Sequence, residues 1–102
     1  AVTGTHRWSS LPEVPTMVEA GLAGYKAETW YGILAPAGTS SAIINRLSAE
    51  VRKALDAPDL KNQFFTQGLN PAPMTPDQFA TLIRDDFNKW SKLIKEAKIS
   101  AN

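Results

Sequence analysis

In one stretch of the chain, between residues 25 and 35, apolar and polar positions alternate over the first half. One face of a strand there would carry Tyr25, Ala27, Thr29, Tyr31 and Ile33. The second half of the stretch is almost wholly apolar, which is typical of a strand that begins at the surface and ends buried. Pro36 and Gly38 would end it. We therefore predict a β-strand over residues 25–35.

In the next part of the chain, apolar residues recur every three or four positions, which is the period of an amphipathic helix. Between residues 41 and 56 these positions are Ile43, Ile44, Leu47, Val51, Ala54 and Leu55. The hydroxyl residues at 39–41 supply a helix cap. A second helix is predicted to begin at Pro58, because proline is tolerated at the first helical position, and to end at Gly68.

The longest periodic pattern predicts a helix over residues 76–97. Thr75, Pro76 and Gln78 combine an N-cap, a proline at the first helical position and a capping-box glutamine. One apolar stripe runs along it, formed by Phe79, Leu82, Ile83, Phe87, Trp90, Leu93, Ile94 and Ala97. We predict this stripe to be the buried face, with Trp90 as its largest side chain.

The remaining segments carry weaker signals. Residues 1–4 read as the end of a strand running into a turn, and residues 5–15 read as an irregular loop. Thr16 and Glu19 have capping-box spacing, which predicts a helix of at most about two turns before Gly21. Residues 69–74 hold two prolines, so they form an edge strand or coil. The fold class is thus α/β, with one or two strands and three to four helices.

Composition excludes several kinds of protein. The 102 residues include 11 Lys and Arg against 10 Asp and Glu, so the net charge is +1, which argues against a strongly electrostatic nucleic-acid binder. We interpret the lysines of the last helix as a solvated face that complements the helix dipole, rather than as a membrane or nucleic-acid surface. No apolar run is long enough to span a membrane. The chain has no cysteine, which excludes disulfides and thiolate metal sites.

The first residues also carry information. The chain begins at Ala1, with no initiator methionine and no basic-then-apolar signal segment. We therefore expect that a signal was removed just upstream or that a longer protein has been cut.

Few residues are candidates for chemistry. His6 is the only histidine and has no metal-ligand partners nearby, so we predict no metal site. No nucleophile motif, acid–base pair or cofactor motif is present, so we predict neither catalysis nor a cofactor. Trp30 and Tyr31 are adjacent on the predicted strand and must point to opposite faces. One of them can join a core while the other contacts substrate in a cleft; the alternative is that both only pack.

The residues together resemble a known family. The segments are Ala1-Val2-Thr3-Gly4, Arg7, Leu11-Pro12-Glu13-Val14-Pro15-Thr16, Glu19-Ala20-Gly21 and Trp30-Tyr31-Gly32-Ile33-Leu34-Ala35-Pro36-Ala37-Gly38-Thr39. In this order they are similar to the Bug-type solute-binding receptors of tripartite tricarboxylate transporters. Ile44-Asn45-Arg46-Leu47, Ala54-Leu55-Asp56-Ala57-Pro58, Gly68 and Thr75-Pro76 follow in family order. Ser40 stands where the family usually has proline, and either residue suits a helix start.

The resemblance implies a periplasmic receptor with a two-lobed, periplasmic-binding-protein-like (type II) fold, about three times longer than this chain. The chain is similar to its C-terminal third and forms a single fragment, residues 1–102. Residues 1–35 would be the end of the second lobe and the strand that crosses between lobes. Residues 36–102 would be a C-terminal helical part on the first lobe. The ligand would be a small carboxylate, held mainly by upstream loops, and the partners would be membrane permease subunits.

Two further expectations complete the sequence-based interpretation. The alternative function is a small stand-alone α/β module that binds a partner protein through exposed apolar surface. Independently of function, the apolar stripes and the strand would lack cover in a chain of this length, and large exposed apolar patches drive association. We therefore expect a homodimer with an interface that includes Trp30 or Tyr31 and part of the last helix.

Overall fold

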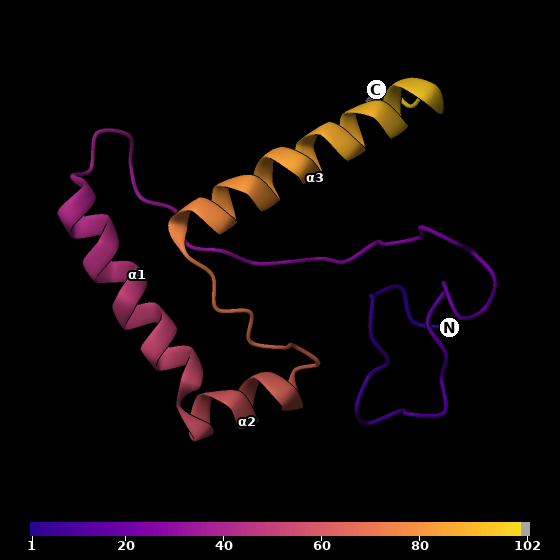
Figure 1. Ribbon diagram of the computed structural model, residues 1–102, viewed down its shortest axis with the longest axis horizontal. Helices are drawn as coiled ribbons and strands as arrows, with labels where there is room; N and C mark the ends of the chain where they lie inside the picture. Colours follow the sequence, from indigo (N-terminus) through magenta and orange to yellow (C-terminus); the bar gives the residue numbers. More distant parts are fainter. Residues whose placement is uncertain (101–102) are drawn as a thin grey trace. The chain divides into compact units, whose positions relative to one another are not determined.

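A computed structural model describes residues 1–100 of the chain. Its helices are α1 (Ser41–Asp56), α2 (Pro58–Thr66) and α3 (Pro76–Glu96), drawn in Figure 1. The chain divides into two compact units, Ala1–Leu34 and Ala35–Asn102, and all three helices belong to the second. Within that unit α1 contacts both α2 and α3.

The first two helices begin and end where local chemistry requires. The Ser40 hydroxyl caps α1 by accepting a hydrogen bond from the Ile43 amide at 3.4 Å. Ala57 is both the C-cap of α1 and the N-cap of α2, so the two helices meet end to end at an elbow (Figure 1). After α2, Gly68 adopts a left-handed φ of 73° and the Leu69 amide bonds back to the Phe64 carbonyl at 2.9 Å. The predicted start and end signals of these helices are confirmed.

The long helix α3 is held at both ends. Thr75 and Gln78 form the predicted capping box, in which each side chain accepts a hydrogen bond from the other residue's amide. At the other end Lys98 adopts the left-handed conformation, with φ of 53°, and the Ile99 amide donates to the Ile94 carbonyl at 3.0 Å. Lysine therefore occupies a position that glycine usually takes.

The first unit is an irregular loop that is held closed by a few backbone hydrogen bonds. Val2 and Thr16 form an isolated parallel bridge, in which the Val2 amide donates to the Pro15 carbonyl and the Met17 amide to the Val2 carbonyl. The short helix predicted after Thr16 is a single hydrogen-bonded turn. It has the expected capping box with Glu19 and ends at Gly21, whose φ is 107°.

The strand predicted over residues 25–35 is not formed within this chain. The segment lies in neither a helix nor a strand, and Figure 1 draws its part in the first unit as a long open run. Its start is attached, because the Ala27 amide donates to the Thr3 carbonyl at 3.1 Å and Glu28 accepts from the Thr5 amide at 3.3 Å. A strand needs a neighbouring strand to bond with, and the described residues supply none beside it. Residues 69–74 are coil, one of the two conformations expected.

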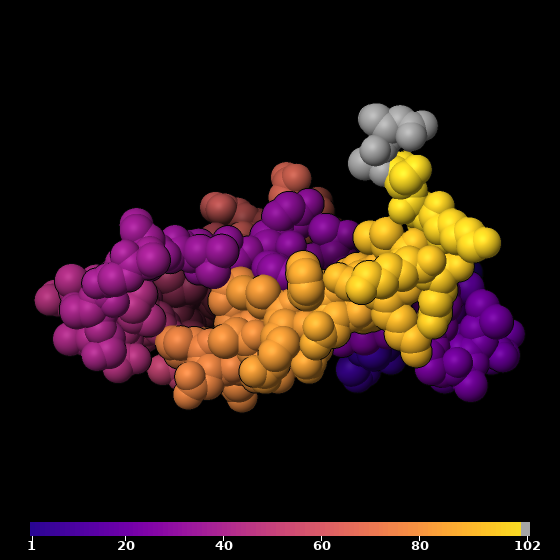
Figure 2. All heavy atoms as spheres, turned by 90° about the horizontal axis from the view of Figure 1, so that it is seen from above, coloured from indigo at the N-terminus to yellow at the C-terminus, as the bar shows by residue number. Residues whose placement is uncertain are grey.

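The burial predicted for the apolar stripe of α3 is also wrong for this chain. Among the described residues no apolar side chain is fully buried, and only the polar Thr16 is, at 4% exposure. Trp90 is 37% exposed, and the stripe is most open in the C-terminal half of the helix, at Phe87, Leu93 and Ile94. Figure 2 shows side chains of α3 open along one side of the helix. A sequence period specifies which face is apolar, but only neighbouring chain can bury it. None of the described helices is long and apolar enough to cross a bilayer.

Candidate functional site

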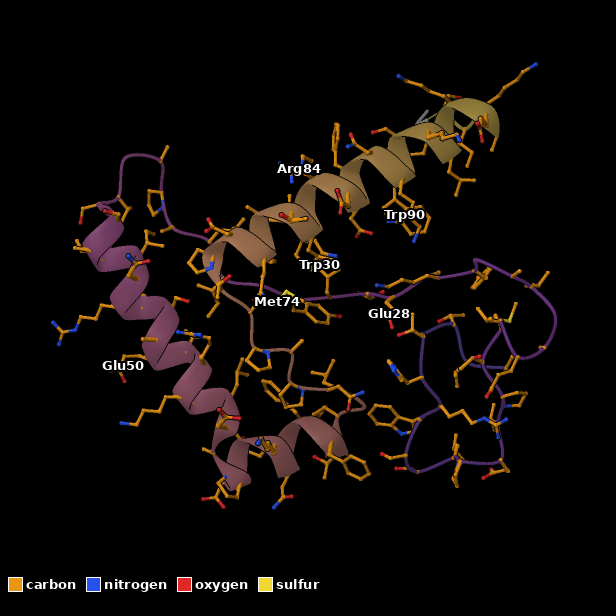
Figure 3. All side chains as sticks on the ribbon, viewed as in Figure 1. Glu28, Trp30, Glu50, Met74, Arg84 and Trp90 are labelled. Carbon is orange, nitrogen blue, oxygen red and sulfur yellow. The ribbon has the colours of Figure 1, made fainter. Side chains whose placement is uncertain are left out.

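The two aromatic residues singled out from the sequence lie in the open segment of the first unit. Trp30, labelled in Figure 3, is 38% exposed, and Tyr31 is 80% exposed. Neither residue lines the hollow described below. Exposed rings of this kind offer flat apolar faces and, in tyrosine, a hydroxyl that can bond to a ligand. They do not by themselves form an enclosed site.

A polar cluster organises the loop that precedes them. The Arg7 guanidinium donates from Nε to Glu19 Oε2 at 2.8 Å and from Nη1 to the Pro12 carbonyl at 2.9 Å. Glu19 Oε2 also accepts from the Thr16 amide at 2.8 Å, and the Thr16 hydroxyl accepts from the Glu19 amide at 3.1 Å. Arg7 therefore ties the far side of the loop to the turn that follows Thr16.

This cluster shifts a pKa. The hydrogen bond from Arg7, followed by that from the Thr16 amide, lowers the pKa of the Glu19 carboxyl below its ordinary value. Two of the three guanidinium nitrogens of Arg7 are thus bonded within the loop. The arrangement is thus a clamp on the loop, at the surface of the first unit.

Because Glu19 is one half of this clamp, the stability of the loop is expected to depend on pH. A carboxyl whose pKa is lower in the folded state contributes stability that is present above the unfolded pKa and is lost as pH falls through the folded pKa. We therefore expect the loop to loosen only below the pH at which an ordinary glutamate takes up its proton. The amide resonance of Thr16, which donates to Glu19, would report the titration by NMR. Glu19→Gln should remove the transition, and a midpoint at or above the ordinary glutamate value would contradict the assignment.

The second unit contains a shallow hollow of about 490 Å³ between α2 and the coil that follows it. Its lining residues are Asp56, Lys61, Asn62, Phe65, Leu69, Asn70, Pro71 and Pro73. The charge at its rim is already paired, because Lys61 Nζ lies 3.2 Å from Asp56 Oδ1. The hollow combines apolar walls with two amides, and sequence reasoning did not single it out.

No metal centre is built by the described residues. His6 Nδ1 lies 3.0 Å from the Thr5 hydroxyl, in an exposed loop. Within residues 1–100 there is no group of three or more His, Asp or Glu side chains placed to hold an ion.

Sequence reasoning missed the partnership of Arg7 with Glu19. Both residues belong to the segments that carry the family resemblance, and the capping-box bond of Glu19 was predicted from its spacing. The ion pair was not, because it joins residues twelve apart across an irregular loop with no periodicity. The only signal of this ion pair in the sequence was a charged residue on each side of a loop that contains prolines.

The chain is similar in sequence to one protein family and to several known proteins. The sequence profile described as the tripartite tricarboxylate transporter family receptor matches residues 1–99. A protein of Pseudomonas sp. strain P51, named the UPF0065 protein in the tcbD-tcbE intergenic region, is 41% identical over 99% of this chain and 30% of its own length. Protein BugT of Bordetella pertussis is 33% identical over 94% of this chain and 29% of its own length.

A third relative fits the same pattern. The UPF0065 protein in the TAR-I ttuE-ttuC' intergenic region of Agrobacterium vitis is 31% identical, over 95% of this chain and 29% of its own length. The chain thus spans about three tenths of the length of these relatives.

Proposed function

The chain belongs to the tripartite tricarboxylate transporter receptor family, and from this membership we propose that it is part of a periplasmic receptor that captures a small carboxylate for uptake. The family is one of solute receptors rather than enzymes. The observation that carries the proposal is the match of the family profile to residues 1–99, supported by relatives that align with nearly the whole chain.

The proposed activity is binding without bond breakage. A small carboxylate is held by backbone amides, hydroxyls and ordered water in a cleft between two lobes that close on it. The closed receptor then docks on permease subunits in the membrane, which recognise its closed shape. Residues 1–35 would contribute the end of one lobe and the crossover, and residues 36–102 the helical part on the other.

Within this proposal Trp30 and Tyr31 are the substrate-contacting residues of the chain. They sit side by side in an open segment, and their ring faces and the Tyr31 hydroxyl suit contact with a ligand at the edge of a cleft. Arg7 and Glu19 support the loop before them without contacting ligand.

A chimera tests the proposal. In the full-length protein of Pseudomonas sp. strain P51, the aligned segment is replaced by this chain, and thermal unfolding is followed with a panel of di- and tricarboxylates. A ligand that binds only the folded state stabilises it by about 2.7 kcal/mol at a hundred times its dissociation constant. We expect the parent and the chimera to be stabilised by the same carboxylates. The 102-residue chain alone should show no heat of binding in calorimetric titration, because most of the cleft is missing.

Control variants distinguish a loss of ligand binding from a loss of the folded state. Tyr31→Ala in the chimera should weaken the stabilisation, whereas Tyr25→Ala, at the start of the same segment, should not. A folded chimera that responds to no carboxylate while the parent does would contradict the receptor role of the chain. A parent that responds to none would contradict the ligand class.

A further inference from the structure

Glu28 lies two residues before Trp30, on the same open run of the first unit (Figure 3). The neighbouring Ala27 amide donates to the Thr3 carbonyl at 3.1 Å. If this pairing continued as a parallel ladder, the next bond would lead from the Thr5 amide to the Ala27 carbonyl. The Thr5 amide donates instead to Glu28 Oε1, at 3.3 Å. A carboxylate thus makes a connection that a ladder makes with backbone alone.

Gly4 leaves room for this carboxylate. Its φ lies outside the left-handed region, so the usual conformational reason for a glycine does not apply. A Cβ at position 4 would lie 2.8 Å from Glu28 Oε1, and the three atoms nearest to it would all belong to Glu28. The missing side chain of Gly4 is therefore what allows the carboxylate to reach the Thr5 amide.

Both oxygens of Glu28 have a partner, since Lys26 Nζ lies 3.5 Å from Oε2. The Lys26 and Glu28 side chains are 51% and 43% exposed, and ion pairs at such exposure contribute little to the free energy of unfolding. Their effect is on position. Residues of an extended chain are about 3.3 Å apart, so the Cα of Trp30 lies within about 7 Å of that of Glu28. The contact therefore sets the point from which the aromatic residues leave the loop.

We propose that Glu28 is a positioning residue for ligand binding. Held against Gly4 by the Thr5 amide, it orients the segment that carries Trp30 and Tyr31. The inference rests on the receptor function proposed above, in which these two aromatic side chains contact the carboxylate. Glu28 itself does not touch the ligand. Ordering a segment during binding costs affinity, so a segment that is already held in place binds more tightly than a free one.

The binding test uses the chimera described above, titrated calorimetrically with the di- and tricarboxylates of the panel. Glu28→Ala is expected to weaken binding roughly three- to tenfold, the affinity equivalent of ordering one flexible side chain. The midpoint of thermal unfolding without ligand should stay unchanged, because the lost contact is exposed. A residue that only supports the fold would instead lower this midpoint.

Gly4→Ala tests the same contact from the opposite side. The added Cβ displaces the flexible end of the Glu28 side chain, so the chimera should fold and show the same loss of affinity. In the Glu28→Ala background, Gly4→Ala should cause no further loss, because the atom that it displaces is gone. Additive losses of affinity would show that the two residues act separately, and would overturn the proposal.

Two control variants separate position from charge. Glu28→Gln keeps an oxygen that can accept from the Thr5 amide, and should retain most of the affinity. Glu13→Ala removes an exposed glutamate of the same unit that lies outside this contact, and should bind as the unaltered chimera does. The proposal is overturned if either control weakens binding as much as Glu28→Ala does.

Hydrogen exchange tests the contact without ligand. The peptide that contains the Thr5 amide should exchange faster in Glu28→Ala and in Gly4→Ala than in the unaltered chimera, because the amide loses its acceptor. Unchanged exchange overturns the proposal. Faster exchange with unchanged affinity overturns the positioning role and leaves the receptor function intact. A chimera that binds no carboxylate contradicts the receptor function instead, and the exchange result then decides whether Glu28 holds the segment.

Discussion

Replacing Gly68 with alanine is expected to lower the free energy of unfolding of the helical unit by about 1–2 kcal/mol, the penalty for a side chain in the left-handed region. Gly68 ends α2 with a φ of 73°, and a Cβ added there meets no atom within 4 Å. The penalty is therefore conformational and not steric. Urea unfolding at fixed protein concentration, followed by circular dichroism at 222 nm, measures it.

The converse change provides the control. Lys98 takes the equivalent position after α3 with a φ of 53°, so Lys98→Gly should raise the free energy of unfolding. The gain is at most about 1 kcal/mol, because the greater freedom of glycine in the unfolded chain offsets part of the relief. If alanine at 68 is neutral and glycine at 98 destabilising, the left-handed helix ends are assigned wrongly.

Thr75→Ala is expected to lower the free energy of unfolding by about 1 kcal/mol, within the range of 0.5–2 kcal/mol typical for loss of an N-cap. The Thr75 hydroxyl accepts from the Gln78 amide at 3.2 Å, and Gln78 Oε1 accepts from the Thr75 amide at 2.9 Å. Removing the hydroxyl leaves one of the first amides of α3 without its cap. The same urea unfolding experiment gives the value.

Two further substitutions separate the contributions of the two hydrogen bonds in the capping box. Thr75→Ser keeps the hydroxyl and should retain most of the stability, whereas Gln78→Ala removes only the reciprocal bond and should have the smaller effect of the two alanine changes. A serine variant as unstable as the alanine variant would show that the threonine methyl group, and not the cap, is responsible.

Local signals in the sequence were enough to predict the helices. The cap at Ser40, proline at position 58 and the Thr75–Gln78 box each act within one turn, so the residues that determine a helix end are its neighbours in sequence. The turn after Thr16 followed the same logic, although only one turn formed. Its capping box and Gly21 lie too close together for a longer helix.

Predictions that depended on distant chain did not hold within these residues. A strand over 25–35 requires a ladder partner, and burial of the α3 stripe requires cover, and neither can be supplied by a neighbour in sequence. Of the candidate site, Trp30 and Tyr31 remain a prediction. The Arg7–Glu19 pair was found only from the structure, because its partners meet across a loop.

The shared cap at Ala57 makes the elbow between α1 and α2 a property of covalent geometry. Proline fixes φ at position 58 and its ring disfavours the helical region for the residue before it, so Ala57 is extended at φ −65° and ψ 129°. The φ of Pro58 and the ψ of Ala57 are therefore both restricted by the proline ring. The range of directions in which α2 can depart from α1 is consequently narrowed before any tertiary contact forms, and polypeptide that packs on these helices must adapt to their bend.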